Sequence, residues 1–332
     1  MFCPAKTLIQ SRGFFKNFAG QAALRFGVPV KNVIGVIQEW LAARRPDAGK
    51  TLREFSVEFT LTGRNDEYEP HWNERMESVL RYNHALFENS GARFQVAFVE
   101  WNPPAGKPLL SPSLVEKYPF VRAIVVAAAV HEKLCETGEI SIMLNFGYNA
   151  AIRTSAADFV LVSGGDDFLG SDVAQWMMKR GLGIGCLYRA VRVDIRNSLD
   201  FENPDAGQLE APQHAVKVNK VGQAPYTNAC GDFILMDREL FQRVRGYDEN
   251  IRFARSGLDG RCCLSAMALG ARCRLIGHVY HIDHSRSYAN NPSTYPGKKY
   301  DYRAGVPYQN PENWGLKSYT WEQKGDRLFY VR

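Results

Sequence analysis

Two adjacent aspartates, Asp166 and Asp167, follow the apolar run Phe159–Val162 and are separated from it by a serine and two glycines. Carboxylates at the end of a buried strand cost free energy unless they bind a cation or accept hydrogen bonds. Mg²⁺ and Mn²⁺ prefer such hard oxygen ligands, and the glycines allow a bound diphosphate to approach the backbone closely. The pattern therefore predicts a Mn²⁺ or Mg²⁺ site at Asp166 and Asp167, with a solvated turn as the alternative.

A second group of short polar motifs lies between residues 228 and 286. The motifs are, in chain order, Gly231-Asp232, Arg238-Glu239-Leu240, Gly246-Tyr247-Asp248-Glu249, Gly257-Leu258-Asp259 and His281-Ile282-Asp283-His284-Ser285-Arg286. Imidazole is a suitable ligand for Mn²⁺ as well as for Zn²⁺. Two histidines three residues apart reach one ion only from a turn or an irregular strand end, because a regular strand directs them to opposite faces. His281 and His284 are therefore candidate metal ligands.

The elements that must position these residues alternate between strands and helices. Strands are expected at residues 55–62, 93–100, 121–128 and 158–163, and helices at residues 72–89, 145–156 and 171–180. This order is typical of a doubly wound α/β fold with a mostly parallel sheet flanked by helices. Ligands of such sheets bind at the carboxyl ends of the strands. Arg64, Asp66 and Glu100, which end or follow the first two strands, are therefore candidate ligand-binding residues.

The motif order resembles the nucleotide-sugar glycosyltransferases with the GT-A fold, both glycosyltransferase family 2 and the galactosyltransferase C-terminal motif. The resemblance covers residues 54–290 and is most specific over residues 228–286. It implies a GT-A, Rossmann-like fold and a metal-dependent, inverting transfer of a sugar from a nucleoside diphosphate, with UDP as the expected nucleotide. The acceptor it implies is a glycan or a lipid-linked sugar, as in the synthesis of a surface polysaccharide.

The resemblance also implies a role for single residues. Asp259 matches the catalytic base, which takes the proton of the acceptor hydroxyl as it attacks the anomeric carbon. Asp166 matches the last acid of an Asp-x-Asp metal motif, with Asp167 beside it, and His281 and His284 match a later metal-binding segment. The nucleotide and the sugar would be bound by Arg64, Asp66, Glu100, Asn149 and Asp232. Gly164 and Leu258 stand where the family has acids, so they depart from its pattern.

Three other functions compete with this interpretation. A degenerate glycosyltransferase that only binds a sugar nucleotide would explain the two missing acids. A nucleotidyl-transfer enzyme is suggested by Gly164-Gly165-Asp166-Asp167, which in palm-type polymerases lies on a turn between two paired strands. In this chain the motif leads through residues 168–172 into the expected helix 171–180, which disfavours that reading. A nucleic-acid binder would need a broad basic surface.

The charge is distributed unevenly along the 332 residues. The net charge is +6, yet residues 1–53 hold nine Lys or Arg against two acidic residues, so the remainder of the chain is close to neutral. This distribution disfavours nucleic acid as a partner and predicts a basic N-terminal extension of two helices over residues 1–53. Such a surface would place the protein on an anionic membrane; helices docked on the main body and an organelle transit peptide are the alternatives.

The composition also indicates a compartment. The longest apolar run, residues 121–130, is about half of what a membrane-spanning helix needs. Seven irregularly spaced cysteines form no disulfide framework and favour a reducing compartment. The expected location is therefore cytoplasmic, on the inner face of a membrane. Residues 291–332, rich in Tyr, Pro, Asn and Gly, are expected to form an irregular tail that packs on the domain.

Overall fold

The structure is a computed structural model that describes residues 50–66, 71–88, 92–196, 204–219, 230–283 and 300–332. The expected N-terminal helices and His284 lie outside these residues. No helix in the described part is long and apolar enough to cross a membrane.

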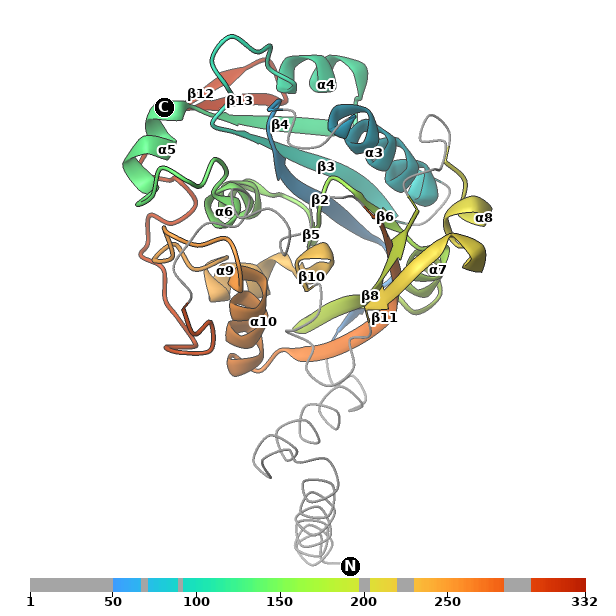
Figure 1. The fold of residues 1–332 in the computed structure, drawn as a ribbon. Coiled ribbons are helices and arrows are strands. Elements are labelled where there is room, and N and C mark those ends of the chain that lie inside the picture. The colour runs from blue at the N-terminus through green and yellow to red at the C-terminus, as the bar shows by residue number, and fades with distance from the viewer. Residues whose placement is uncertain (1–49, 67–70, 89–91, 197–203, 220–229, 284–299) are drawn as a thin grey trace, which may run out of the picture. The chain divides into compact units, whose positions relative to one another are not determined.

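An 11-stranded mixed sheet forms the centre of the described part (Figure 1). Its strands follow the order β12-β13-β4-β3-β2-β5-β10-β8-β11-β6, and β9 pairs with β8. Their bounds are β2 Phe55–Gly63, β3 Ala92–Trp101, β4 Val121–Val126, β5 Phe159–Val162, β6 Asp167–Leu169, β8 Cys186–Ile195, β9 Ala215–Asn219, β10 Ile234–Asp237, β11 Arg272–Ile282, β12 Trp321–Lys324 and β13 Leu328–Val331. A separate two-stranded ladder pairs β1 Thr51–Leu52 with β7 Leu182–Gly183.

The sheet has a parallel half and a mixed half. Strands β13, β4, β3, β2 and β5 are parallel to one another. Beyond β5 the direction reverses, because β10 is antiparallel to both β5 and β8. Strand β11 is then parallel to β8, and β6 is antiparallel to β11. The predicted α/β class is confirmed, and β4, β3, β2 and β5 of the parallel half correspond to the strands expected from the sequence.

Helices cover both faces of the sheet, which explains why β5 consists of four consecutive buried apolar residues. Phe159 and Leu161 pack in the cluster that includes α3 and α7, whereas Val160 and Val162 pack in the cluster that includes α6, α9 and α10. The helices are α3 Trp72–Glu88, α4 Ser111–Lys117, α5 Ala128–Leu134, α6 Leu144–Thr154, α7 Ser171–Arg180, α8 Ala206–Leu209, α9 Arg238–Val244 and α10 Leu258–Ala268; two 3₁₀ turns are η1 Pro212–His214 and η2 Cys230–Asp232.

Two expectations need correction. The third strand ends at Val126 rather than at residue 128, because Ala128 already begins α5. The C-terminal tail is not irregular throughout, since β12 and β13 form a hairpin and β13 pairs in parallel with β4. The tail therefore extends the sheet, and Trp314 and Leu316 before the hairpin are buried in the core.

Candidate functional site

Strand directions bring several acids, among them Asp167, Asp194 and Asp232, to one edge of the sheet, the acid-rich edge. The carboxyl end of β5 lies beside the start of β10, and the carboxyl ends of β8 and β11 lie at the same edge because of their pairing with β10 and with each other. In the β6–β11 ladder, Asp167 pairs directly with His281, and His281 pairs with Asp194 of β8. Residues far apart in the sequence are thus neighbours at this edge.

Asp167 is fully buried and holds the turn that precedes it. Its Oδ2 accepts hydrogen bonds from the Gly164 amide at 2.7 Å and from the Ser163 hydroxyl at 3.2 Å. Its Oδ1 is buried and has no hydrogen-bond partner among the described residues. Burial, reinforced by the negative charge of Asp232, raises the pKa of Asp167 well above its ordinary value.

The geometry at Asp167 explains why Gly164 replaces the first acid of the Asp-x-Asp pattern. A Cβ on Gly164 would lie 2.6 Å from Asp167 Oδ2, closer than real Cβ contacts allow. An aspartate at position 164 would therefore displace the carboxylate that the turn is built around. Gly164 and the position of Asp167 therefore belong to the same local arrangement.

Arg192 lies between two further carboxylates. Its Nε donates to Asp194 Oδ1 at 2.6 Å, and its Nη1 donates to Asp232 Oδ2 at 3.1 Å. Asn219 Nδ2 donates to the other oxygen of Asp194 at 2.8 Å, and His281 Nδ1 lies 3.4 Å from Asp194 Oδ1. Although burial opposes it, these partners hold the pKa of Asp194 well below its ordinary value.

Asp259 lies in the first turn of α10, next to η2. The helix follows Gly257, whose φ of 76° is the left-handed conformation that glycine tolerates. A Cβ on Gly231 would lie 2.8 Å from Asp259 Oδ2, so the absence of a side chain lets η2 lie against this carboxylate. Burial, together with the charge of Asp232, raises the pKa of Asp259 to about 6. The residue as a whole is partly exposed to solvent.

Asp166 points to a different partner from its neighbour. Arg75 Nε of α3 donates to Asp166 Oδ1 at 2.9 Å, and both side chains are almost completely buried. The backbone carbonyl of Asp166 accepts from the Ile282 amide at 3.2 Å, which ties this turn to the end of β11. The two acids of the motif are therefore held separately, one by an arginine and one by backbone and hydroxyl groups.

The described residues do not fit a divalent metal ion. No group of three His, Cys, Asp or Glu side chains among them is arranged to hold one. Asp166 is paired with Arg75, and the guanidinium of Arg192 contacts Asp194 and Asp232. The free oxygen of Asp167 supplies a single ligand. The predicted ligand His284 lies outside the described residues, so its role stays a prediction.

The residues predicted to bind the nucleotide have contacts with other parts of the structure. Arg64 pairs with Asp66 at 3.1 Å, and its Nη1 donates to the Ser141 carbonyl at 3.0 Å. Glu100 is fully buried, and its two oxygens accept from the amides of Leu110 and Ser111, each at 2.9 Å. These contacts make Glu100 an anchor for the start of α4.

Asn149 likewise has structural contacts. It is fully buried on α6. Its Nδ2 donates to the Tyr247 carbonyl at 2.8 Å and to Glu249 Oε1 at 2.9 Å, and its Oδ1 accepts from the Tyr247 amide at 2.6 Å. Asn149 therefore fixes the Gly246-Tyr247-Asp248-Glu249 motif against α6. Nucleotide binding by Asn149, Glu100, Arg64 and Asp66 stays a prediction.

Arg192 and Asp194 belong to no sequence motif and were not predicted as site residues. A signal was present, because two charged residues two positions apart on a strand project from the same face. Tyr247 was noted only as part of a motif. It is completely buried, and burial together with the charge of Asp259 raises the pKa of its hydroxyl well above the ordinary value. Its phenol therefore lies close to the candidate base.

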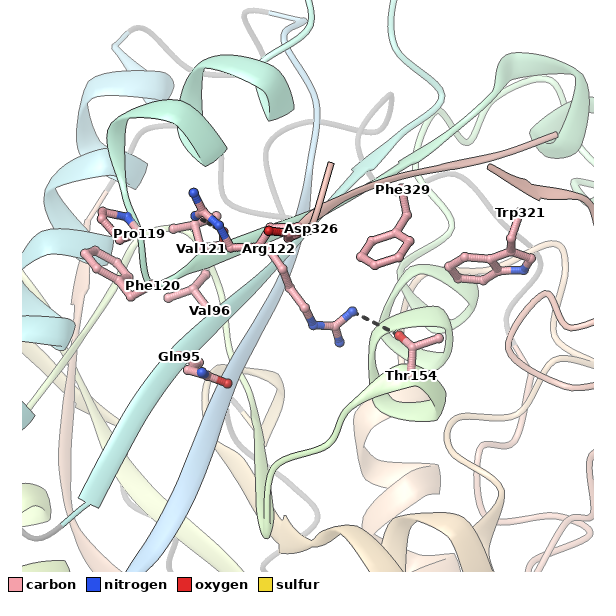
Figure 2. A pocket seen from close by; sticks show the side chains of 11 residues that line it. Gln95, Val96, Pro119, Phe120, Val121, Arg122, Thr154, Trp321, Asp326 and Phe329 are labelled. Carbon is pink, nitrogen blue, oxygen red and sulfur yellow. Dashed lines mark hydrogen bonds between the residues drawn. The ribbon is translucent and has the colours of Figure 1, made fainter. Parts of the chain in front are cut away.

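A cavity of about 330 Å³ lies at the other end of the parallel strands, away from the acid-rich edge. Figure 2 shows Arg122 of β4 reaching Thr154, with Trp321 and Phe329 beside them. None of the predicted site residues lines this cavity. The chemistry predicted from the sequence therefore belongs to the acid-rich edge.

Comparisons with known proteins give only distant similarity. No protein-family model matches the sequence, and no curated protein sequence matches it significantly. Among solved structures, a mannosyltransferase, PcManGT from Pyrobaculum calidifontis in complex with GDP-Man and Mn²⁺, has a TM-score of 0.46 and 14% identity, covering 82% of this chain and 70% of that chain. A mycobacterial protein has a TM-score of 0.40 and 13% identity, covering 76% and 72%. Inferences about this chain rest on its own residues.

Proposed function

We propose that the chain is a glycosyltransferase that moves a sugar from a nucleoside diphosphate to an acceptor hydroxyl. The observation that carries the proposal is the gathering of Asp167, Asp232 and Asp259 at the carboxyl edge of the sheet. Burial and the charge of Asp232 raise the pKa of Asp259 to about 6 there, and the residue as a whole is partly exposed. A carboxylate with that pKa is ionised at neutral pH and is a stronger base than an ordinary aspartate.

In the proposed reaction Asp259 is the general base. Its carboxylate accepts the proton of the acceptor hydroxyl as the hydroxyl oxygen forms a bond to the anomeric carbon. The bond between that carbon and the diphosphate oxygen breaks, and the nucleoside diphosphate leaves with the bonding electron pair. Attack from the side opposite the leaving group inverts the configuration, as the motif order implies.

Asp232 and Gly231 support this role by position. Asp232 lies close enough to raise the pKa of Asp259, and its side chain is partly accessible. It can therefore accept hydrogen bonds from sugar hydroxyls next to the base. Gly231 keeps the η2 backbone against Asp259 and limits the directions that the carboxylate can take.

The donor, the acceptor and the location are further parts of the proposal. UDP is the proposed nucleotide, and the acceptor is a glycan or a lipid-linked sugar. The basic N-terminal segment would hold the enzyme on the anionic inner face of a membrane, in the cytoplasm. Full-length protein should bind anionic vesicles at low salt, and failure to bind them would remove the membrane part of the proposal.

The nucleotidyl-transfer alternative requires the Gly-Gly-Asp-Asp turn to join two paired strands. The turn does lie between two strands, contrary to the direct entry into a helix that the sequence suggested. However, β5 pairs with β2 and β10, whereas β6 pairs with β11. Since β5 and β6 are not neighbours, the motif forms no hairpin of the palm type.

A thermal-shift panel tests the proposed donor class. The full chain would be melted with UDP, GDP, CDP and their sugar derivatives, each in EDTA and in Mn²⁺. One nucleoside diphosphate should raise the melting temperature, because a ligand that binds only the folded state stabilises it. Absence of a shift with every nucleotide in both conditions would contradict the proposed function.

A further inference from the structure

The acid cluster, defined as Asp167, Asp194, Asp232 and Asp259, contains its own counter-charges. Three cationic side chains act on it. Arg192 contacts Asp194 and Asp232, His281 lies against Asp194 and acts on Asp167, and Arg189 acts on Asp259. Four carboxylates and three cations leave a single negative charge when all are ionised.

Arg192 has a position that a bound cation would otherwise take. Its guanidinium contacts two of the acids and is held electrostatically by Asp167 as well. A guanidinium presents five donors in a planar fork, so one side chain can serve several carboxylates at once. The strand of Arg192 is paired on both sides, with Asn219 of β9 and Val279 of β11 opposite it. Its backbone is therefore fixed at the cluster.

A divalent ion would meet two obstacles in this arrangement. It would face the positive guanidinium at close range, and it would have to separate Asp194 and Asp232 from Arg192. The oxygen of Asp167 that accepts no hydrogen bond from the described residues gives it only one ready ligand. Without Arg192 the same cluster would have four carboxylates against two cations, a net charge of −2 when all are ionised.

We propose that Arg192 takes the place of a divalent cation in the acid cluster, so that the cluster binds neither Mn²⁺ nor Mg²⁺. It follows, resting on the proposed function, that a nucleoside-diphosphate donor binds and reacts without added metal. This separates the chain from the metal dependence that its motif order implies.

Electron paramagnetic resonance of Mn²⁺ with the full chain tests the proposal without any nucleotide. Mn²⁺ mixed with an equal concentration of wild-type protein should keep the spectrum of the free ion. Arg192→Met should bind Mn²⁺ at least about tenfold more tightly than wild type, since a positive charge is removed from among the carboxylates. Lys179→Met, which removes an exposed cation from α7, is the control and should behave as wild type.

The wild-type spectrum decides the proposal even where Arg192→Met does not fold. One Mn²⁺ bound per wild-type chain, and lost in Asp167→Asn, would overturn it; a site that needs His284 would also be detected, because the full chain is used. A nucleoside diphosphate that raises the melting temperature equally in EDTA and in Mn²⁺ supports the proposal. A shift that requires Mn²⁺ overturns the proposal about Arg192 but is consistent with the proposed function. If no nucleotide causes a shift, the proposed function is overturned, and the Mn²⁺ spectrum alone then shows whether the acid cluster binds metal.

Discussion

The two ends of the central sheet each place an arginine against buried carboxylates, with different outcomes. At the amino end, Arg122 donates two hydrogen bonds of 2.7 Å to Glu58, and its remaining donors reach Thr154 and the Ala151 carbonyl at 3.0 Å. At the carboxyl edge, Arg192 is divided between Asp194 and Asp232. Arg122 is thus paired with one carboxylate, whereas Arg192 is shared by two.

This difference in pairing indicates which end of the sheet contains the candidate active site. One cation matched to one carboxylate, with both carboxylate oxygens bound by the guanidinium, is a structural arrangement. Burial raises the pKa values of Asp167 and Asp259, and the negative charge of Asp232 raises them further. Groups that titrate near neutral pH in a partly accessible place are typical of active sites.

The largest expected effect comes from removing the base. Asp259→Asn should lower the turnover of the sugar donor by about 10²–10⁴-fold, because general-base catalysis contributes factors of that size. Binding of the nucleoside diphosphate should remain close to wild type. The measurement is donor turnover together with nucleotide binding for both proteins, and equal turnover would exclude Asp259 as the base.

Breaking the Arg122–Glu58 pair should lower the free energy of unfolding and leave turnover unchanged. Arg122→Met leaves the buried Glu58 carboxylate without its partner and should destabilise the fold by about 3 kcal/mol. Denaturant unfolding measures this loss, and the double variant Glu58→Gln with Arg122→Met should recover part of it. A loss of turnover per folded molecule would contradict the structural role assigned to this end.

The pH dependence of the free energy of unfolding should reveal the raised pKa of Asp259. The folded pKa of Asp259, about 6, lies above that of an unfolded aspartate, so its contribution to stability is present at low pH and lost as pH rises through about 6. Asp259→Asn should therefore stabilise the fold at pH 8 by about 1–2 kcal/mol and have little effect near pH 4. Unfolding of wild type and variant at both values gives the comparison; destabilisation at pH 8 would contradict it.

The smallest expected effect comes from adding one carbon beside the base. Gly231→Ala places a Cβ against Asp259 Oδ2 and should lower turnover by about tenfold by displacing the carboxylate. Gly138→Ala is the matched control, because a Cβ at Gly138 meets nothing within 4 Å. Wild-type turnover in Gly231→Ala would show that the position of Asp259 is less restricted than proposed.

Strands β2, β3, β4 and β5 could be predicted because they are apolar runs and helical patterns follow several of them. β6 has three residues, too few for a period to show, and its partner β11 lies more than a hundred residues away. The hairpin β12–β13 has mixed polar and aromatic residues at the edge of the sheet, which resemble a loop in sequence. These elements depend on long-range pairing rather than on local pattern.

Some residues of the candidate site could likewise be predicted from the sequence, and others could not. Asp232 and Asp259 stand next to glycines that mark close approaches of the backbone, so their motifs could be recognised. Arg192 and Asp194 acquire their meaning only where β8 meets β11 and β9. The contacts of Glu100 and Asn149 with backbone groups depend on turns that the sequence does not specify.

The pH profile of nucleoside-diphosphate release tests the central claim most directly. Wild-type protein would be incubated with UDP- and GDP-sugars between pH 4.5 and 8, and the released diphosphate measured. Since the base must be ionised to accept a proton, release from one donor should rise through a pH of about 6, the pKa of Asp259. No release from any donor, or a rate that does not change across this range, would contradict the assignment of the acid-rich edge as a sugar-transfer site.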